Sequence, residues 1–383
     1  MYPEVSATDR ERSSPAYAHP PPYDSIDSLE KASQTGSKWN PKNWSKLTIL
    51  CVIAGVVAVI AGIVIGAVLG TKLNEYPDYS ALNYILSDTY SGTSFFDDFD
   101  YFTGYDPTSG FVHYVDSSVA TSSQYNLTYA SSSSAVLKVD TTDTNANTGR
   151  YSVRITSKKQ YDSGLFIFDV VHSPYGCSTW PALWLTDPSN WPTNGEIDVM
   201  EAVNQADTGN QMTLHTSAGC KMNVKRKETG SVLYKNCVNT TNDNAGCGVQ
   251  GAQDTYGEAF NANGGGVYAM EWRDEGIRVW FFARSEIPSD IPSDVSNTSA
   301  PDPSTWGTPL ADFPGTHCDI SSHFKNQSIV ANIDLCGTWA GSTAVYNNED
   351  SCPGTCTEFV TTNNTAFETA YWQWNSWRVY TAS

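Results

Sequence analysis

Asn194-Gly195-Glu196-Ile197-Asp198-Val199-Met200-Glu201-Ala202 is the stretch of this sequence that carries the most structural information. Its apolar residues predict a β-strand, yet three of its positions are carboxylates, which are depleted in strands. Glu196 and Asp198 are two residues apart and therefore point to the same face. Glu201 reaches that face only if one extra residue forms a β-bulge around Val199-Met200. The spacing thus predicts a bulged strand that gathers three carboxyl groups on one surface.

Paired carboxyl groups on either side of one bond are the arrangement that glycoside hydrolysis uses. One group is the proton donor, and the other is the nucleophile or the base for a water molecule. The middle acid, Asp198, would crowd Glu196, and like charges that close raise one pKa. A solvated, acidic strand face would show the same residues. The spacing alone separates neither these two interpretations nor retention from inversion.

Tryptophans precede this strand at Trp180, Trp184 and Trp191. An indole ring can stack on the apolar C–H face of a sugar, although any one of these rings could equally fill a core. His215 follows on a segment that predicts a neighbouring strand, which makes it a candidate hydrogen-bond partner for a substrate. The aromatic residues beside the acids favour a carbohydrate cleft.

The chain from residue 149 onward resembles the fungal branch of glycoside hydrolase family 16, the laminarinase-like endo-1,3(4)-β-glucanases. The matching segments are 149–155, 164–167, 172–174, Trp180-Pro181-Ala182-Leu183-Trp184, 194–201, 268–272, 276–282, Cys336-Gly337-Thr338-Trp339-Ala340-Gly341 and 371–377. They cover roughly the last three hundred residues, a length typical of one large β domain.

The resemblance implies an all-β fold, a two-sheet antiparallel β-sandwich of the jelly-roll, concanavalin A-like type. Short alternating segments separated by Gly, Asn, Asp and Ser agree with this fold. It also implies a retaining mechanism with Glu196 as nucleophile, Glu201 as acid and then base, and Asp198 hydrogen-bonded to the nucleophile. The positions that the resemblance implies as substrate contacts are Trp184, Trp191, His215 and Trp339, with Trp180 near them.

Three functions are compatible with these residues. The first is hydrolysis of β-1,3- or mixed 1,3/1,4-glucan. The second is a cell-wall glucan transglycosylase that uses a sugar as acceptor at the same site, and the third is a non-catalytic glucan-binding wall-assembly protein, which the three converging acids disfavour. We expect no cofactor and no catalytic metal; the structural calcium common in the family has no ligands that the sequence identifies.

Residues 47–69 are apolar except for Thr48 and would span about 35 Å as a helix. No small-residue cleavage site follows cleanly, which disfavours a cleaved signal peptide, and few buried helices are apolar on every face. Lys38, Lys42 and Lys46 precede the segment, against Lys72 after it, which predicts a cytosolic N-terminus.

We therefore expect a single-pass type II membrane protein with an extracellular or luminal catalytic domain. Its predicted parts are a disordered cytosolic tail (1–46), a signal anchor in the lipid bilayer (47–70), a stem (71–93) and the catalytic domain (94–383).

Two interaction motifs lie in the N-terminal part. Small residues recur every four positions in the apolar segment, a spacing that allows close helix–helix approach and predicts a homodimer; Gly and Ala are also simply common in such helices. These residues are Ala54, Ala58, Gly62, Gly66 and Gly70. The tail contains Pro20-Pro21-Pro22-Tyr23, the form that WW domains bind, although a proline-rich tail without a reader fits equally well.

Charge and cysteines separate the two sides of the apolar segment. Residues 1–46 carry six basic and six acidic side chains, so the net charge of −19 lies beyond residue 70 and argues against nucleic acid as a partner. Eight of the nine cysteines lie there too, an even number that predicts up to four disulfides. Cys352 and Cys356 would make a zinc half-site, but no second pair completes it. Sequons on the same side lie at Asn126, Asn239, Asn297, Asn326 and Asn363.

Overall fold

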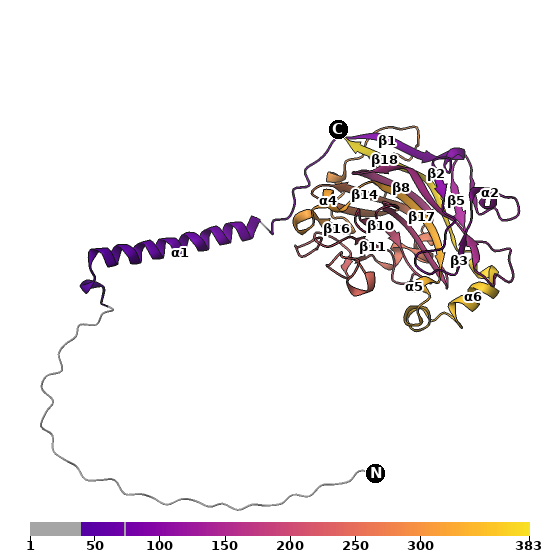
Figure 1. Ribbon diagram of the computed structural model, residues 1–383. Coiled ribbons are helices and arrows are strands. Elements are labelled where there is room, and N and C mark those ends of the chain that lie inside the picture. The colour runs from indigo at the N-terminus through magenta and orange to yellow at the C-terminus, as the bar shows by residue number, and fades with distance from the viewer. Residues whose placement is uncertain (1–39, 73) are drawn as a thin grey trace, which may run out of the picture. The chain divides into compact units, whose positions relative to one another are not determined.

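The computed structural model describes residues 40–72 and 74–383, which divide into two compact units at Val68 and Leu69. The first unit holds a short 3-10 helix, η1 (Pro41–Asn43), and most of helix α1 (Lys46–Lys72) (Figure 1). Among the described residues, α1 is the one helix long and apolar enough to cross a membrane. The proline-rich motif at Pro20–Tyr23 and the tail up to residue 39 lie outside the described residues.

The second unit is built on two large antiparallel sheets, which confirms the predicted all-β sandwich (Figure 1). The sheet that carries the acids runs in the order β12-β13-β11-β10-β9-β17-β7-β2. Its strands are β2 (Phe99–Tyr101), β7 (Arg154–Tyr161), β9 (Thr179–Thr186), β10 (Glu196–Glu201), β11 (Gln211–His215), β12 (Ser231–Val232), β13 (Val249–Gln250) and β17 (Gln327–Leu335). We call it the acid sheet.

The opposing sheet runs in the order β16-β15-β14-β8-β18-β5-β4, and β1 also pairs with β18. Its strands are β1 (Tyr84–Ser91), β4 (Thr128–Ala130), β5 (Ala135–Lys138), β8 (Gly164–His172), β14 (Gly266–Arg273), β15 (Gly276–Ala283), β16 (Ala311–Pro314) and β18 (Tyr371–Ala382). A separate parallel pair joins β3 (Val112–Tyr114) to β6 (Arg150–Ser152).

Helices in this unit are short and lie in the connections. They are η2 (Gly92–Ser94), α2 (Ser117–Ala120), η3 (Asn242–Asn244), η4 (Gln253–Thr255), α3 (Gly257–Ala262), η5 (Pro303–Thr305), η6 (Gly315–His317), α4 (Ile320–His323), α5 (Gly337–Ala340), η7 (Ala344–Glu349), α6 (Cys356–Thr362) and η8 (Asn364–Phe367).

Alternating residues of the two sheets form the main core. The acid sheet contributes Leu183 and Leu185 of β9, and the opposing sheet contributes Phe166 and Phe168 of β8, all in one buried cluster. Since successive side chains of a strand point to opposite faces, the residues between them, such as Trp184, point away from the core. The acid sheet therefore has one buried face and one face available for a cleft.

A second, smaller core covers the outer face of the opposing sheet. Leu165 of β8 and Trp280 of β15 are buried there against Ile291, with Ile287 and Trp306 packed on the cluster. Residues 287–309 form a long loop apart from η5, and its apolar residues cover this face of the sheet.

The predicted stem at 71–93 needs a correction, because its second half is a strand of the sandwich. Tyr84 pairs with Ala382 and Ser91 with Ser376 along β1 and β18. Polar residues such as Ser87 and Asp88 hide the strand in the sequence, since what holds β1 is the backbone ladder rather than an apolar run. The predicted domain start at residue 94 is therefore too late.

Four disulfides cross-link this unit, which agrees with the number predicted. They are Cys177–Cys352, Cys220–Cys318, Cys237–Cys247 and Cys336–Cys356. Cys352 and Cys356 belong to different bridges, so they form no zinc half-site. Cys51 of α1 is not in a disulfide.

Candidate active site

Strand β10 contains the predicted bulge, at Val199. Against β9, Asp198 pairs with Trp184 but Met200 pairs with Leu183, so Val199 is the extra residue. The ladder to β11 shifts over the same interval, between Asp198 and Glu201. Ile197, Val199 and Met200 are all fully buried in the core. The bulge prediction is confirmed, and its effect is that Glu201 returns to the face that carries the first two acids.

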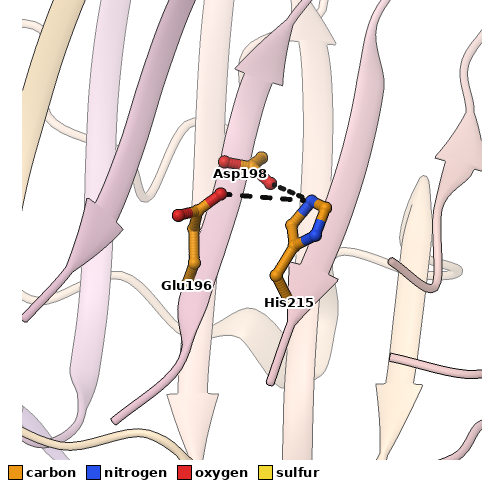
Figure 2. Close-up of side chains that lie close together, drawn as sticks. All are labelled: Glu196, Asp198 and His215. Atoms are coloured by element: carbon orange, nitrogen blue, oxygen red, sulfur yellow. Dashed lines mark ion pairs between the residues drawn. The ribbon is translucent and has the colours of Figure 1, made fainter. Parts of the chain in front are cut away.

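A histidine from the neighbouring strand closes the acid cluster (Figure 2). His215 pairs with Glu196 across β10 and β11. Its Nε2 lies 3.4 Å from Asp198 Oδ2 and 4.0 Å from Glu196 Oε1. Its Nδ1 lies 3.1 Å from Asn244 Oδ1, so the Nδ1–H donates to the amide oxygen. The ring is thereby held with its other nitrogen directed at the two carboxylates.

Burial and mutual repulsion raise the pKa of both glutamates. Burial and the charge of Asp198 raise the pKa of Glu201 to about 8, against the lowering effect of the Trp180 indole. The same two causes raise the pKa of Glu196 to about 7, and here His215 lowers it. Carboxyl groups with these values are poised to exchange protons near neutral pH.

His215 is the cation of the cluster. Burial lowers its pKa, but the hydrogen bond to Asp198 and the charges of Glu196, Asp198 and Glu201 outweigh burial and raise the pKa to about 9. The ring nitrogen and the two nearest carboxylates lie within 4.8 Å of one another, a spacing that a metal ion could also use. A protonated His215 supplies the positive charge that these acids need, which is why we treat the group as an acid–histidine cluster.

Two tryptophans stand beside Glu201. Trp180 Nε1 donates to Glu201 Oε1 at 2.8 Å, and Trp339 packs edge-on against Trp180 with ring centroids 5.6 Å apart. Trp339 lies on α5, whose N-cap Cys336 and first residue Gly337 have positive φ values of +66° and +64°. A Cβ at Gly337 would lie 2.9 Å from the Trp180 ring, so glycine is required there.

The other two predicted tryptophans lie differently. Trp184 is on the same face of β9 as Trp180, four residues on, and its Nε1 donates to Asn332 Oδ1 at 2.8 Å. Trp191 lies between β9 and β10 and is 44 % exposed; it lowers the pKa of Glu196 through a hydrogen bond. The structure therefore brings the eight predicted site residues together on the acid sheet. His215, Trp180 and Trp191 contact the three acids, Trp339 packs on Trp180, and Trp184 pairs with Asp198 on the neighbouring strand.

Arg154 is a site residue that sequence reasoning missed. Cross-strand pairs place it in one row with Asn332, Ala182 and Glu201 across the acid sheet. Its guanidinium carbon lies 5.0 Å from the Phe102 ring centroid and 4.9 Å from that of Trp184. The sequence signal that could have identified Arg154 is a charged side chain at the start of a segment with strand-like alternation, β7.

The family comparison places residues 99–380 on a model described as an XgeA-like, catalytic GH16 domain. Among curated relatives, a probable glycosidase of Schizosaccharomyces pombe is 48% identical over 311 residues, which cover 80% of this chain and 71% of the relative. An endo-1,3(4)-beta-glucanase of Arthroderma benhamiae is 40% identical over 317 residues, which cover 80% of this chain and 67% of that protein.

Two solved structures are similar in fold and sequence. GH16 laminarinase 16A from Phanerochaete chrysosporium, solved with 6-O-glucosyl-laminaritriose in its donor and acceptor sites, is 45% identical with a TM-score of 0.73. The match covers 78% of this chain and 99% of the laminarinase. An elongating GH family 16 beta-1,3-glucosyltransferase is 43% identical with a TM-score of 0.71, over 78% of this chain and all of that one (100%).

Proposed function

Because the chain belongs to glycoside hydrolase family 16, we propose that it is a retaining endo-β-glucanase that cleaves β-1,3- or mixed 1,3/1,4-glucan. The observation that carries the proposal is the bulge at Val199, which brings Glu196, Asp198 and Glu201 to one face of β10. A solvated acidic strand needs no such bulge, and it would not place an indole N–H on one of its acids, as Trp180 does on Glu201.

The three acids take different roles in this proposal. Glu201, whose pKa lies above neutral, holds the proton that is transferred to the leaving glycosidic oxygen. Glu196 attacks the anomeric carbon and forms the glycosyl-enzyme. The ionised Glu201 then removes a proton from water, whose oxygen attacks the same carbon and releases Glu196. Asp198 contacts the protonated His215, which favours the ionised nucleophile.

Aromatic rings supply the surface for the sugar units. Trp180 and Trp339 stand beside the acid Glu201. The exposed Trp191 hydrogen-bonds the nucleophile Glu196, and Trp184 pairs with Asp198 across β9 and β10. Indole faces complement pyranose C–H faces, so we assign these four residues and His215 to substrate binding. The net charge of −19 suits a neutral polysaccharide rather than an anionic one.

A sugar acceptor in place of water is the second candidate. The elongating GH family 16 beta-1,3-glucosyltransferase shares this fold at a TM-score of 0.71 and 43% identity, so this architecture serves glucosyl transfer in that protein. Both reactions share the glycosyl-enzyme and differ only in which hydroxyl attacks it.

Helix α1 supports a membrane location for the enzyme. We propose that residues 47–70 anchor the protein in the bilayer with a cytosolic N-terminus, an extracellular or luminal catalytic domain and a homodimer contact along the small residues of α1. Replacement of both Gly62 and Gly66 by Leu should abolish association in a membrane two-hybrid reporter; unchanged association would remove the dimer from the proposal.

The decisive experiment compares the full-length protein in detergent micelles with its Glu196→Gln variant on laminari-oligosaccharides, with products followed by mass spectrometry. Loss of the nucleophile should lower the rate by roughly 10³-fold or more. Shortened products that vanish in the variant establish hydrolysis, and lengthened products that vanish establish transfer. Glucan binding without any product from the native protein would contradict both.

A further inference from the structure

The bulge at Val199 interrupts the backbone ladder of β10 on both of its sides. The pairing of β10 with β9 shifts between Asp198 and Met200, and the pairing with β11 shifts between Asp198 and Glu201. A bulge disrupts the ladder locally, and a buried backbone N–H or C=O without a partner is strongly unfavourable. The feature that gathers the acids therefore needs hydrogen-bond partners from elsewhere.

One side chain provides both partners. Asn210 Oδ1 accepts a hydrogen bond from the backbone N–H of Glu201 at 2.9 Å. Asn210 Nδ2 donates to the backbone C=O of Val199 at 2.8 Å. The orientation of the amide follows from the chemistry of its partners, because an N–H needs an acceptor and a C=O needs a donor. The side chain spans the bulge and replaces the interrupted ladder.

Asn210 is itself rigidly held. It is fully buried, its backbone N–H donates to Thr255 Oγ1 at 2.9 Å, and its C=O accepts from the Gly251 N–H at 2.8 Å. The preceding Gly209 has a φ of +86°, and a Cβ there would lie 2.0 Å from the Ala252 carbonyl oxygen. The loop around residues 251–255 thus fixes Asn210, and Asn210 fixes the bulge.

We propose that Asn210 is a positioning residue for Glu201, which it holds at the backbone while Trp180 holds its carboxyl end. The inference rests on the proposed role of Glu201 as acid and base. It assigns to Asn210 the task of keeping that carboxyl in register with the bond to be cleaved, since a displacement of about 1 Å can cost about 10²-fold in rate. Asn210→Ala removes both hydrogen bonds. Asn210→Asp keeps the acceptor for the Glu201 N–H but places a second acceptor oxygen against the Val199 carbonyl, which needs a donor.

The test separates positioning of the acid from a general effect on folding. Full-length native protein, Asn210→Ala and Asn210→Asp are assayed on laminarihexaose, whose leaving sugar must be protonated, and on 2,4-dinitrophenyl β-laminaribioside, whose leaving group needs no proton. Sodium azide is added as a nucleophile that needs no base. The matched control is Asn261→Ala. Asn261 of α3 makes the same pair of bonds to Ser173, just after β8: its Oδ1 accepts from the Ser173 N–H at 2.8 Å, and its Nδ2 donates to the Ser173 C=O at 3.0 Å.

We expect Asn210→Ala to lose about 10- to 100-fold in kcat/KM on laminarihexaose and only a few-fold on the activated substrate, with azide raising its turnover and yielding a glycosyl azide. Asn261→Ala should lose the same factor on both substrates. Equal losses for Asn210→Ala on both substrates without an azide effect, or no loss at all, would overturn the assignment. If Asn210→Ala does not fold, the same ratio measured on Asn210→Asp decides. A native protein inactive on both substrates would instead refute the proposed function.

Discussion

His215 contributes charge as well as geometry to the acid cluster. Its protonated ring is one of the groups that lower the pKa of Glu196, and its own pKa is raised to about 9 by the acids it faces. The nucleophile must be ionised to attack, so a cation beside it extends activity toward acid pH.

Replacement of His215 by Ala should therefore move the acidic limb of the kcat/KM profile to higher pH. Activity below that limb should fall about tenfold for each unit by which the pKa of Glu196 rises. The pH profile of hydrolysis measures this, with His113→Ala, an exposed histidine, as the control. A His215→Ala profile that is lower at every pH by one factor would contradict an electrostatic role.

Arg154 makes a different prediction, because its guanidinium contacts two aromatic rings in the row of the acid sheet that ends at Glu201. Its guanidinium lies between the rings of Phe102 and Trp184, and such contacts contribute about 0.5–2 kcal/mol. Arg154→Ala should raise the KM for oligosaccharides roughly tenfold. Arg154→Lys keeps the charge but not the planar ring contact, so its KM should lie between those of the native protein and of Arg154→Ala. An unchanged KM in a steady-state assay would exclude Arg154 from the cleft.

At the scale of elements, the segment between Cys237 and Cys247 fixes the histidine. Asn242, Asp243 and Asn244 all have positive φ values (51°, 54° and 66°), a strained conformation that persists only when the surroundings hold it. The Cys237–Cys247 disulfide closes this segment into a loop. Within the loop, the Asn244 side chain forms the hydrogen bond to His215 Nδ1.

Simultaneous replacement of Cys237 and Cys247 by Ser should release Asn244 and lower kcat several-fold, because the His215 ring is then free to turn. Chain-entropy arguments also predict a loss of about 3 kcal/mol in stability for a short loop, so activity is compared below the melting temperature. The control is the Cys177–Cys352 pair, neither member of which lies in the 237–247 segment. Equal specific activity of the two double variants would rule out this coupling.

The bulged strand could be predicted from sequence because carboxylates are costly in a strand, so the spacing of Glu196, Asp198 and Glu201 has few explanations. The neighbouring strand β11, which carries His215, could be predicted from the same kind of local alternation. Asn210 and Asn244 carried no such signal, since an amide that bonds to backbone has no periodicity. Strand β1 was not predicted for a related reason. Its partner β18 lies almost three hundred residues away, and backbone pairing between distant strands has no recognisable sequence pattern.

At the scale of the whole molecule, the acid cluster makes stability depend on pH. Folding raises the pKa of Glu196, Glu201 and His215 from 4.5, 4.5 and 6.5 to about 7, 8 and 9. All three shifts favour the protonated form in the folded state, so their contribution is complete below pH 4.5 and is lost as pH rises toward 9.

The melting temperature should therefore be a few degrees higher at pH 5 than at pH 9. Thermal unfolding followed by near-UV circular dichroism across this range measures it. Glu201→Gln removes one of the three groups and should flatten the dependence. A melting temperature that rises toward pH 9 would show that other groups dominate the titration.

The position of β18 sets the order in which this protein can fold as it is made. Every other strand precedes β18 in the chain, yet β18 lies inside its sheet, bonded to β5, β8 and β1. The ribosome therefore releases β1 nearly three hundred residues before its partner exists. Until β18 emerges, β1, β5 and β8 lack their partner in the sheet, so we expect their unpaired edges to be prone to mispairing during synthesis.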